Sequence, residues 1–377
     1  MNDEKNPKHL VFVISSLRAG GAERVTATLA RSLGQRMRVT IICLSAAEPP
    51  FYPVPDTVER IYLDRMGENA SLTDAVRANL GRLRDLRKTL KQLSPQIIVS
   101  HMLETNVLTI LAGTGLNTPV LVCEHTDPAI LRHKLPWRLL RKLLYRLSDG
   151  VVVLNESMRR YFASIAPGKV NLIPNPVEVS FDPSFEAPEG PYVLGMGRLV
   201  DSKGFQHLID AFARIAGKFP AWRLYIAGDG PSRNRLQAQI ESLDLGDQVK
   251  LLGQSTRPHD LMRHAEFFAS ASSIEAFPMA ICEAMACARP VVAYACNPDI
   301  KGLIGPDQGI VVNDMGNALA GALENLMSHE QLRKQMGQSA VSGMTQYGTA
   351  AVTDLWLETF NRTAGIGFPP VTGAPPA

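Results

Sequence analysis

Cysteine is scarce in this sequence, and aromatic residues make up only 6% of its 377 residues. The five cysteines are odd in number and include no C-x-x-C pair, a pattern that argues against both a disulfide framework and a zinc site. We therefore expect buried free thiols in a protein of a reducing compartment. The cysteines are Cys43, Cys123, Cys282, Cys287 and Cys296.

Long hydrophobic runs are also missing. The uncharged stretch Val107–Cys123 is interrupted by Gly113, Gly115 and Pro119, which leaves pieces shorter than the roughly 20 residues that span a bilayer. The start, Met1–Leu10, mixes acidic and basic residues and lacks the build of a cleavable signal peptide. These features predict a cytoplasmic protein without a membrane-spanning helix.

Neither sign of charge dominates, because the sequence contains 39 basic and 36 acidic residues. The distribution is uneven: residues 1–188 contain 24 basic and 18 acidic residues, and the remainder contains 15 and 18. The first half is therefore the better candidate for contact with an anionic surface. Its basic residues are not interleaved with aromatic ones and form no known binding motif, so nucleic acid is not expected as a partner.

The chain has an ordinary globular composition and a regular alternation of expected strands and helices. Its length suggests two domains of roughly 150–200 residues, and 45% of the residues are hydrophobic. Short runs rich in β-branched residues alternate with segments of helical period, and this pattern occurs in two sets. It predicts an α/β protein with two parallel, doubly wound sheets. The expected strands are Leu10–Ile14, Arg38–Leu44, Ile97–Ser100, Val120–Cys123, Gly150–Leu154, Tyr192–Met196, Arg223–Ala227, Val249–Leu252, Phe267–Ala269 and Pro290–Ala293; expected helices include Ala22–Leu33, Phe205–Phe219, Ser232–Leu243, Pro258–Ala265 and Asn317–Ser328.

Five prolines crowd into the segment Ile173–Pro191, which has no apolar periodicity and is typical of an interdomain linker. We place one domain over residues 1–185 and a second over 186–349. The Gly/Pro-rich end, residues 365–377, is expected to be disordered. Ligands of open α/β sheets bind beyond the carboxyl ends of the strands, so two such domains are expected to face each other across a cleft.

Two glycine-containing loops follow expected strands. Gly20 and Gly21 precede a helix, whose free N–H groups could bind an anion; a tight turn without a ligand is the alternative. In the second domain, Arg198 leaves the strand and Lys203 precedes the helix, so both cations could meet a diphosphate. The alternative is that they are solvated surface charges. The G-x-G at Gly195 lacks the other features of a dinucleotide-binding fingerprint.

The most specific segment is Ser270–Ala286. Glu275 lies just before the expected helix start at Pro278, and Glu283 lies inside that helix. One carboxylate could accept hydroxyl hydrogen bonds and the other could hold a vicinal diol, as a sugar nucleotide requires. The alternative is that Glu275 caps the helix and Glu283 pairs with a cation, because a buried unpaired carboxylate costs several kcal/mol.

Taken together, these pieces resemble the retaining glycosyltransferases of family 4, which have the GT-B fold of two Rossmann-like domains. The resemblance extends over about residues 10–295 in the family's order. The matching residues are Gly20–Arg24, Glu124-His125, Ile173–Val177, Gly197–Leu199 with Lys203-Gly204, Gly228–Pro231, the pair Glu275 and Glu283 with Glu283–Ala286, and Arg289–Ala293.

The resemblance implies a UDP-sugar donor, no metal and no other cofactor. Arg198 and Lys203 would bind the donor diphosphate, Glu283 the ribose and Glu275 the transferred sugar. The remaining implied contacts are the amides of Phe277 and Met279 along the sugar, Gly20 and Gly21 over the phosphates, and His125 near the anomeric carbon. Transfer would retain the anomeric configuration, with the departing diphosphate helping to deprotonate the acceptor. Ala276 and the loop Tyr294–Ile300 depart from the family's glycine-containing pattern, which leaves the identity of the sugar open.

Acceptors of such enzymes are bound mainly by the first domain, where this chain is basic. A candidate amphipathic helix from Pro136 carries Arg138, Lys142 and Arg146 on one stripe, with Leu140, Leu143, Leu144 and Leu147 on another. The segment Arg77–Leu93 repeats the pattern. These helices either attach the protein peripherally to the anionic inner face of the plasma membrane, near a polyprenyl-diphosphate-linked saccharide acceptor, or bury their leucines in the domain.

Relatives also imply that a helix at residues 350–363 packs back on the first domain.

Alternatives to transfer on the same fold are a sugar-nucleotide epimerase and a glycosyl phosphorylase. The chain has no pyridoxal-binding lysine segment, which counts against a phosphorylase. A non-catalytic sugar-nucleotide-binding or membrane-docking protein is the alternative from another class. The intact set of Arg198, Lys203, Glu275 and Glu283 argues against it.

Overall fold

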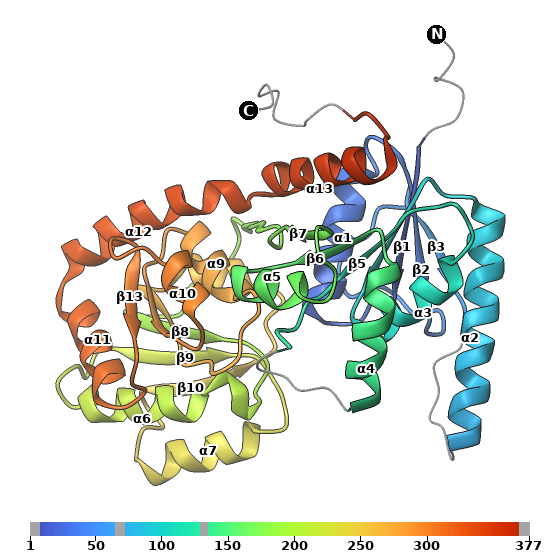
Figure 1. Ribbon diagram of the computed structural model, residues 1–377. Coiled ribbons are helices and arrows are strands. Elements are labelled where there is room, and N and C mark those ends of the chain that lie inside the picture. Colours follow the sequence, from blue (N-terminus) through green and yellow to red (C-terminus); the bar gives the residue numbers. More distant parts are fainter. Residues whose placement is uncertain (1–7, 65–71, 129–134, 369–377) are drawn as a thin grey trace. The chain divides into compact units, whose positions relative to one another are not determined.

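A computed structural model of the chain describes residues 8–64, 72–128 and 135–368, apart from the side chains of residues 72–76. The described chain forms two compact units (Figure 1). One comprises the residues up to Pro176 together with those from Thr349, and the other comprises Val177–Gly348. The division therefore falls inside the proline-rich segment but ahead of the expected boundary at 185. The residues just after it belong to the second unit because Val177 and Ser180 donate backbone hydrogen bonds to Tyr347 and His259.

Among the residues that the structure describes, the first unit is built on seven parallel strands in the order β3-β2-β1-β4-β5-β6-β7. Every residue of the central strand β1 is buried, as expected for a strand that is covered on both faces. The strands are β1 (His9–Ile14), β2 (Arg38–Cys43), β3 (Glu59–Tyr62), β4 (Ile97–His101), β5 (Val120–Cys123), β6 (Gly150–Val153) and β7 (Val170–Leu172).

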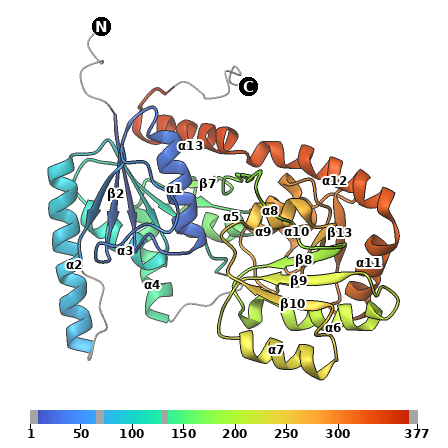
Figure 2. The same ribbon diagram turned by 180° about the vertical axis from the view of Figure 1, so that it is seen from behind.

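Helices cover this sheet, and one of them comes from the far end of the chain. Figures 1 and 2 both show α13 beside α1. Residues of α13, among them Trp356 and Phe360, share a buried core with Leu10 and Phe12 of β1. The helices of this unit are α1 (Gly21–Leu33), α2 (Leu72–Leu93), α3 (Leu103–Gly113), α4 (Leu135–Leu144), α5 (Glu156–Ala163) and α13 (Thr349–Ala364).

The second unit is built on six parallel strands in the order β10-β9-β8-β11-β12-β13. Alternation along β8 divides the core in two: Val193 packs with residues of α6 and α11, and Leu194 packs with residues of α9 and α12. The strands are β8 (Tyr192–Met196), β9 (Arg223–Ala227), β10 (Val249–Gly253), β11 (Phe267–Ser270), β12 (Val291–Tyr294) and β13 (Gly309–Val312). The helices are α6 (Phe205–Ala216), α7 (Arg233–Ser242), α8 (Pro258–His264), α9 (Met279–Ala286), α10 (Pro298–Leu303), α11 (Asn317–Ser328) and α12 (Glu330–Met344).

The predicted pair of parallel, doubly wound sheets is confirmed. All five cysteines are free, and all but the half-buried Cys296 are buried. None of the described helices is both long and apolar enough to cross a membrane. The prediction that the tail is disordered from residue 365 onward is wrong at its start, because Ile366 and Phe368 pack against the core of the first unit. The rest of that tail, residues 369–377, lies outside the described residues.

Candidate active site

The order of strands in the second sheet identifies where a ligand would bind. β8 and β11 are neighbours, with β9 on the far side of β8 and β12 on the far side of β11. The chain therefore leaves these two central strands in opposite directions, which opens a crevice at their carboxyl ends. The loop after β8 contains Arg198 and Lys203, and the loop after β11 contains Glu275. Three of the residues singled out in the sequence thus come from this switch point.

Lys203 and Glu275 are in direct contact. Nζ of Lys203 lies 2.5 Å from Oε1 of Glu275, and their side chains are 29% and 14% exposed. The two loops are fastened together, because the carbonyl of Ser202 accepts hydrogen bonds from the Ser273 amide at 2.8 Å and from the Ser272 hydroxyl at 3.1 Å. This ion pair is therefore a fixed feature of the crevice, and Lys203 is more than a solvated surface charge.

Gly204 allows this close approach. Its φ is +66°, and a Cβ at this position would lie 2.0 Å from the carbonyl oxygen of Ala271. A side chain here would separate the loop after β8 from the loop after β11. Gly204 thus contributes to the site by its lack of a side chain.

A residue that the sequence reasoning did not single out, Asn297, also holds Glu275. Its side-chain nitrogen donates to the backbone carbonyl of Glu275 at 2.6 Å. Its side-chain oxygen caps α10 by accepting from the amides of Asp299 and Ile300. The Asn-Pro pair at a helix start was the available signal. It predicts the cap but not the second contact.

Glu283 is buried in α9 and lies near His259 of α8. Oε2 of Glu283 is 3.9 Å from Nε2 of His259. Because the Ser180 amide donates to Nδ1 of His259 at 3.1 Å, a neutral His259 carries its proton on Nε2, the nitrogen that faces Glu283. Sequence reasoning missed His259, whose position in a short helix gave no sign of this role.

The other residues of this unit that were predicted to contact the sugar nucleotide are Arg198, Phe277 and Met279. Arg198 is exposed, and its side chain has no hydrogen bond or ion pair with any described residue. The amide of Met279 donates to the Phe277 carbonyl at 3.0 Å, and its predicted contact with the sugar stays a prediction. The turn that starts α9 occupies that amide. Phe277 instead packs its ring near Tyr347, with 5.7 Å between the ring centroids.

In the first unit, Gly20 precedes α1 as predicted, with extended backbone. A Cβ on Gly20 would lie 2.0 Å from Oε2 of Glu23, so this glycine makes room for a carboxylate of its own helix. Burial raises the pKa of Glu23. Gly21 has open space around its α-carbon. Contact of either glycine with phosphate stays a prediction.

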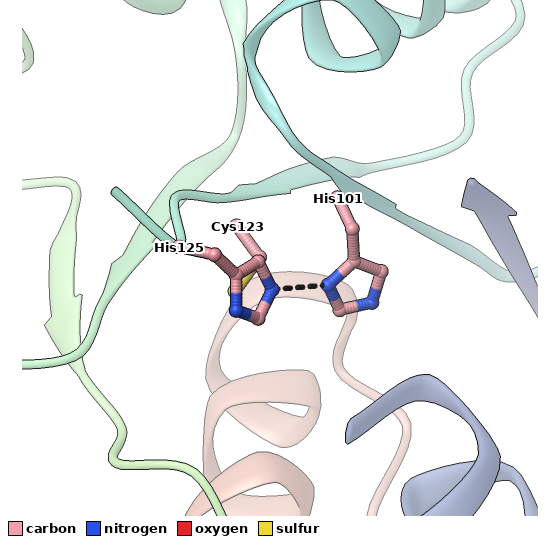
Figure 3. Close-up of side chains that lie close together, drawn as sticks. All are labelled: His101, Cys123 and His125. Atoms are coloured by element: carbon pink, nitrogen blue, oxygen red, sulfur yellow. Dashed lines mark hydrogen bonds between the residues drawn. The ribbon is translucent and has the colours of Figure 1, made fainter. Parts of the chain in front are cut away.

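His125 lies just beyond the carboxyl end of β5, as predicted, and contacts His101 at the end of β4. Nε2 of His125 is 2.8 Å from Nδ1 of His101, and Figure 3 shows the two rings pointing toward each other. Burial lowers the pKa of His125 to about 4 and holds that of His101 well below its ordinary value. Cys123 lies beside them, and the three side chains offer ligand atoms within 4.8 Å of one another, so they could hold a metal ion.

Glu124 joins this loop to α4. It is buried and accepts a 2.5 Å hydrogen bond from the Tyr145 hydroxyl, and its Oε1 lies 4.0 Å from Nη1 of the buried Arg141. Burial raises the pKa of Glu124 to about 7, although Tyr145 and Arg141 lower it. The residue before His125 is thus anchored to α4 by an internal polar network.

The two candidate amphipathic helices differ in what they bury. α2 buries Leu86 and Leu90 in the domain. α4 and the turn after it instead expose most of their leucines, with Leu143 at 64% and Leu139 at 53% exposed. The other exposed leucines are Leu135, Leu140 and Leu147, and the exposed cations beside them are Arg138, Lys142 and Arg146. We call these eight residues the α4 patch.

Comparison with known proteins identifies the family. The family model described as Glycosyltransferase Family 4 matches residues 19–181, and the one described as Glycosyl transferases group 1 matches residues 177–342. A Campylobacter jejuni protein is 30% identical over 354 residues, which cover 92% of this chain and 96% of the relative. This chain is a family 4 glycosyltransferase with the GT-B fold.

That relative is named GalNAc-alpha-(1->4)-GalNAc-alpha-(1->3)-diNAcBac-PP-undecaprenol alpha-1,4-N-acetyl-D-galactosaminyltransferase. An Erwinia amylovora amylovoran biosynthesis glycosyltransferase is 27% identical, and the match covers 94% of the glycosyltransferase described here and 99% of that protein. Among solved structures, Anabaena HepE in complex with UDP superposes with a TM-score of 0.75 at 18% identity, over 94% of this chain and 99% of that one. At this identity, the similarity to HepE shows only that the two proteins share the fold.

Proposed function

We propose that the protein transfers a hexosyl or N-acetylhexosaminyl group from a UDP-sugar to a saccharide acceptor carried on a polyprenyl diphosphate, with retention of configuration, in the assembly of a cell-surface glycan. The name of the Campylobacter relative, with its undecaprenol-linked saccharide, supports the acceptor class. The structure of HepE with UDP supports the nucleotide. Amylovoran synthesis by the Erwinia relative supports the pathway class.

The observation that carries the proposal is the Lys203–Glu275 pair at the switch point. An ammonium group has three protons, and Glu275 accepts one of them, so two remain for the oxygens of a diphosphate. Arg198 is exposed on the same loop and adds a second cation. Glu275 offers its other oxygen to a sugar hydroxyl, and Glu283 is assigned to the ribose hydroxyls.

In the proposed reaction the bond between the anomeric carbon and the diphosphate oxygen breaks as the bond to the acceptor oxygen forms on the same face. The proton of the acceptor hydroxyl passes to the departing diphosphate. Lys203 and Arg198 stabilise the negative charge that develops there, so that no metal is required. Gly20, Gly21 and His125 belong to the first unit, and their part in the reaction stays a prediction.

The α4 patch is the proposed contact with the membrane that presents the lipid-linked acceptor. Its leucines offer apolar side chains to the interface, and its three cations match the charge of anionic headgroups. At about 1 kcal/mol for each cation near such a surface, the attachment is peripheral and reversible.

The test is to replace Lys203 with alanine and to measure acceptor-dependent release of UDP in the presence of a chelator. One charge-assisted hydrogen bond contributes about 1.5–3 kcal/mol, so turnover should fall about 10- to 150-fold. Lys218→Ala removes an exposed lysine that pairs with Glu324 elsewhere in the same unit, and it should leave turnover unchanged. Unchanged turnover in Lys203→Ala would refute the assignment. Conversion of the donor without acceptor would favour an epimerase.

A further inference from the structure

We propose that His101 is a positioning residue for His125: its Nδ1–H donates to Nε2 of His125, so that His125 presents an N–H at Nδ1, and not a lone pair, to a ligand. The proposal rests on the function proposed above only for the nature of that ligand, an oxygen of the donor or acceptor. The state of the two rings can be tested without activity.

The pairing of the two rings follows from the register of the sheet. β4 and β5 are parallel neighbours, with His101 opposite Cys123, so the loop that follows Cys123 brings His125 over the end of β4. The ring centroids are 5.1 Å apart and the planes are inclined by 35°. His101 is completely buried, and His125 is partly exposed. The fold therefore determines that these two nitrogens meet.

One proton must lie between the two nitrogens, because 2.8 Å is a hydrogen-bond distance. Burial lowers the pKa of both imidazoles, so at neutral pH each ring is uncharged and carries a single N–H. Two arrangements satisfy these conditions. Either His101 donates from Nδ1 and His125 carries its own proton on Nδ1, or His125 donates from Nε2 and His101 carries its proton on Nε2.

The second nitrogen of His101 decides between them. Nε2 is buried and has no hydrogen-bond partner. The ring of Phe12 lies 5.6 Å away at an inclination of 34°, too nearly parallel for an N–H of His101 to point at its face. If Nε2 carried a proton, it would be a buried donor without an acceptor, which is rarer in proteins than an unused acceptor. The proton of His101 therefore lies on Nδ1.

The consequence is a donor at Nδ1 of His125. Figure 3 shows this nitrogen on the side of the ring away from His101. It has no hydrogen bond with any described residue and is not among the buried unpartnered atoms, so it is the nitrogen that a ligand can reach. An N–H there binds an oxygen lone pair, as in a sugar hydroxyl or a phosphate, and cannot accept the proton of an attacking hydroxyl. His125 is thereby excluded as the general base, in agreement with proton transfer to the departing diphosphate.

The alternative use of these side chains is a metal site with Cys123. Around a tetrahedral ion with metal–nitrogen bonds of about 2.0–2.1 Å, two nitrogens lie about 3.3 Å apart. The observed 2.8 Å instead fits two rings that share a proton. The geometry therefore favours the hydrogen-bonded pair, and the metal is an outcome that the experiment must distinguish.

The first experiment records long-range ¹H–¹⁵N correlations of histidine-labelled, chelator-treated protein at pH 7.5 without ligand. His101→Gln and His125→Gln assign the two rings among the eight histidines. The expected result is a protonated Nδ1 and a bare Nε2 on both rings. A protonated Nε2 on either ring would overturn the proposal. Equimolar Co²⁺ should produce no thiolate charge-transfer band; a band that Cys123→Ser abolishes would equally overturn it.

The second experiment asks whether the donor matters for transfer. His101→Asn keeps an N–H near the position of Nδ1, and His101→Leu removes it. Loss of one neutral hydrogen bond should lower kcat/KM about 2- to 10-fold in His101→Leu, and His101→Asn should restore it. The protonation state of the His125 ring is the second readout. If His101 sets that state, His125 is in the Nδ1–H form in His101→Asn and in a mixture of both forms in His101→Leu. A merely structural role of His101 would not produce this difference. If the unaltered protein transfers no sugar, the proposed function fails, but the NMR result still decides the ring state.

Discussion

At the scale of single residues, the most unusual chemistry of this glycosyltransferase is gathered where β4 and β5 end. Burial favours the neutral form of each ionisable group there: it lowers the pKa of His101 and His125 and raises that of Glu124. These groups can still be tolerated because each one has a hydrogen-bond partner inside the first unit. The shifts make stability depend on pH in two opposite ways.

The histidine shift predicts a loss of stability in acid. The pKa of His125 is about 4 in the folded protein against 6.5 for the free side chain, so the unfolded chain binds the proton more readily in this range. The free energy of unfolding should therefore fall as the pH drops from about 6.5 toward 4. His125→Gln removes part of that loss. Urea unfolding at pH 7 and pH 4.5 checks this, and an equal loss in both proteins would contradict the assignment.

Glu124 predicts the opposite trend. Its pKa rises from 4.5 to about 7 on folding, so the folded protein binds the proton more readily and stability falls as the pH rises through this range. Glu124→Gln cannot lose that proton and keeps an oxygen for the Tyr145 hydroxyl. Measured by urea unfolding, the variant should gain stability relative to wild type between pH 5 and pH 8. A difference that does not change with pH would contradict the raised pKa.

At the scale of elements, α2 and α4 show how one sequence pattern serves two purposes. Both helices alternate leucine with basic residues, but α4 leaves most of its leucines exposed, whereas α2 buries Leu86 and Leu90 and exposes Leu80. The buried anchor of α4 is Arg141, which faces Glu124 and stacks near the ring of Tyr161. A guanidinium in place of a leucine on the inner face turns the apolar stripe outward, which is unfavourable in water unless another surface covers it.

The α4 patch therefore predicts charge-dependent binding to vesicles. Replacing Arg138, Lys142 and Arg146 with glutamine should weaken binding to anionic vesicles by about 100-fold at low salt, since each cation contributes about 1 kcal/mol. The matched control replaces three exposed cations of α2, Arg84, Lys88 and Lys91, and should bind nearly as wild type does. Flotation of both variants with the wild type measures this. Equal weakening in the two triple variants would indicate a general charge effect and remove the role of α4.

At the scale of the whole molecule, the chain leaves the first unit at Pro176 and returns to it at Thr349. The returning helix α13 completes the core beside α1, and its Phe360 is fully buried. The first unit is therefore not a continuous piece of sequence, and its stability depends on residues that follow the whole second unit in the chain.

Phe360→Ala tests that dependence. Removing a buried phenyl ring and leaving a cavity costs about 3–5 kcal/mol, so the urea midpoint of the first unit should fall substantially. Glu358→Ala changes an exposed residue of the same helix and should have little effect. Limited proteolysis can assign the loss to the first unit. A stable Phe360→Ala protein would mean that α13 is dispensable for that core.

The sequence by itself determined the class of fold, most of the strands and the loops that contain Lys203, Glu275 and His125. This worked because central strands of a parallel sheet are continuous apolar runs that end in polar loops, so their period and their ends are visible in one dimension. The strands β3, β7 and β13 escaped notice because edge strands are short and only partly buried.

Only the tertiary structure decided which side chains meet. The bonds of Asn297 to Glu275, Ser180 to His259 and His101 to His125 join segments that are far apart in the sequence, and no local pattern specifies such partners. The same holds for the exposed face of α4, because the direction of an amphipathic helix depends on what it packs against. Periodicity is a property of neighbours along the chain, whereas contact, burial and the pKa shifts that follow from it are properties of neighbours in space.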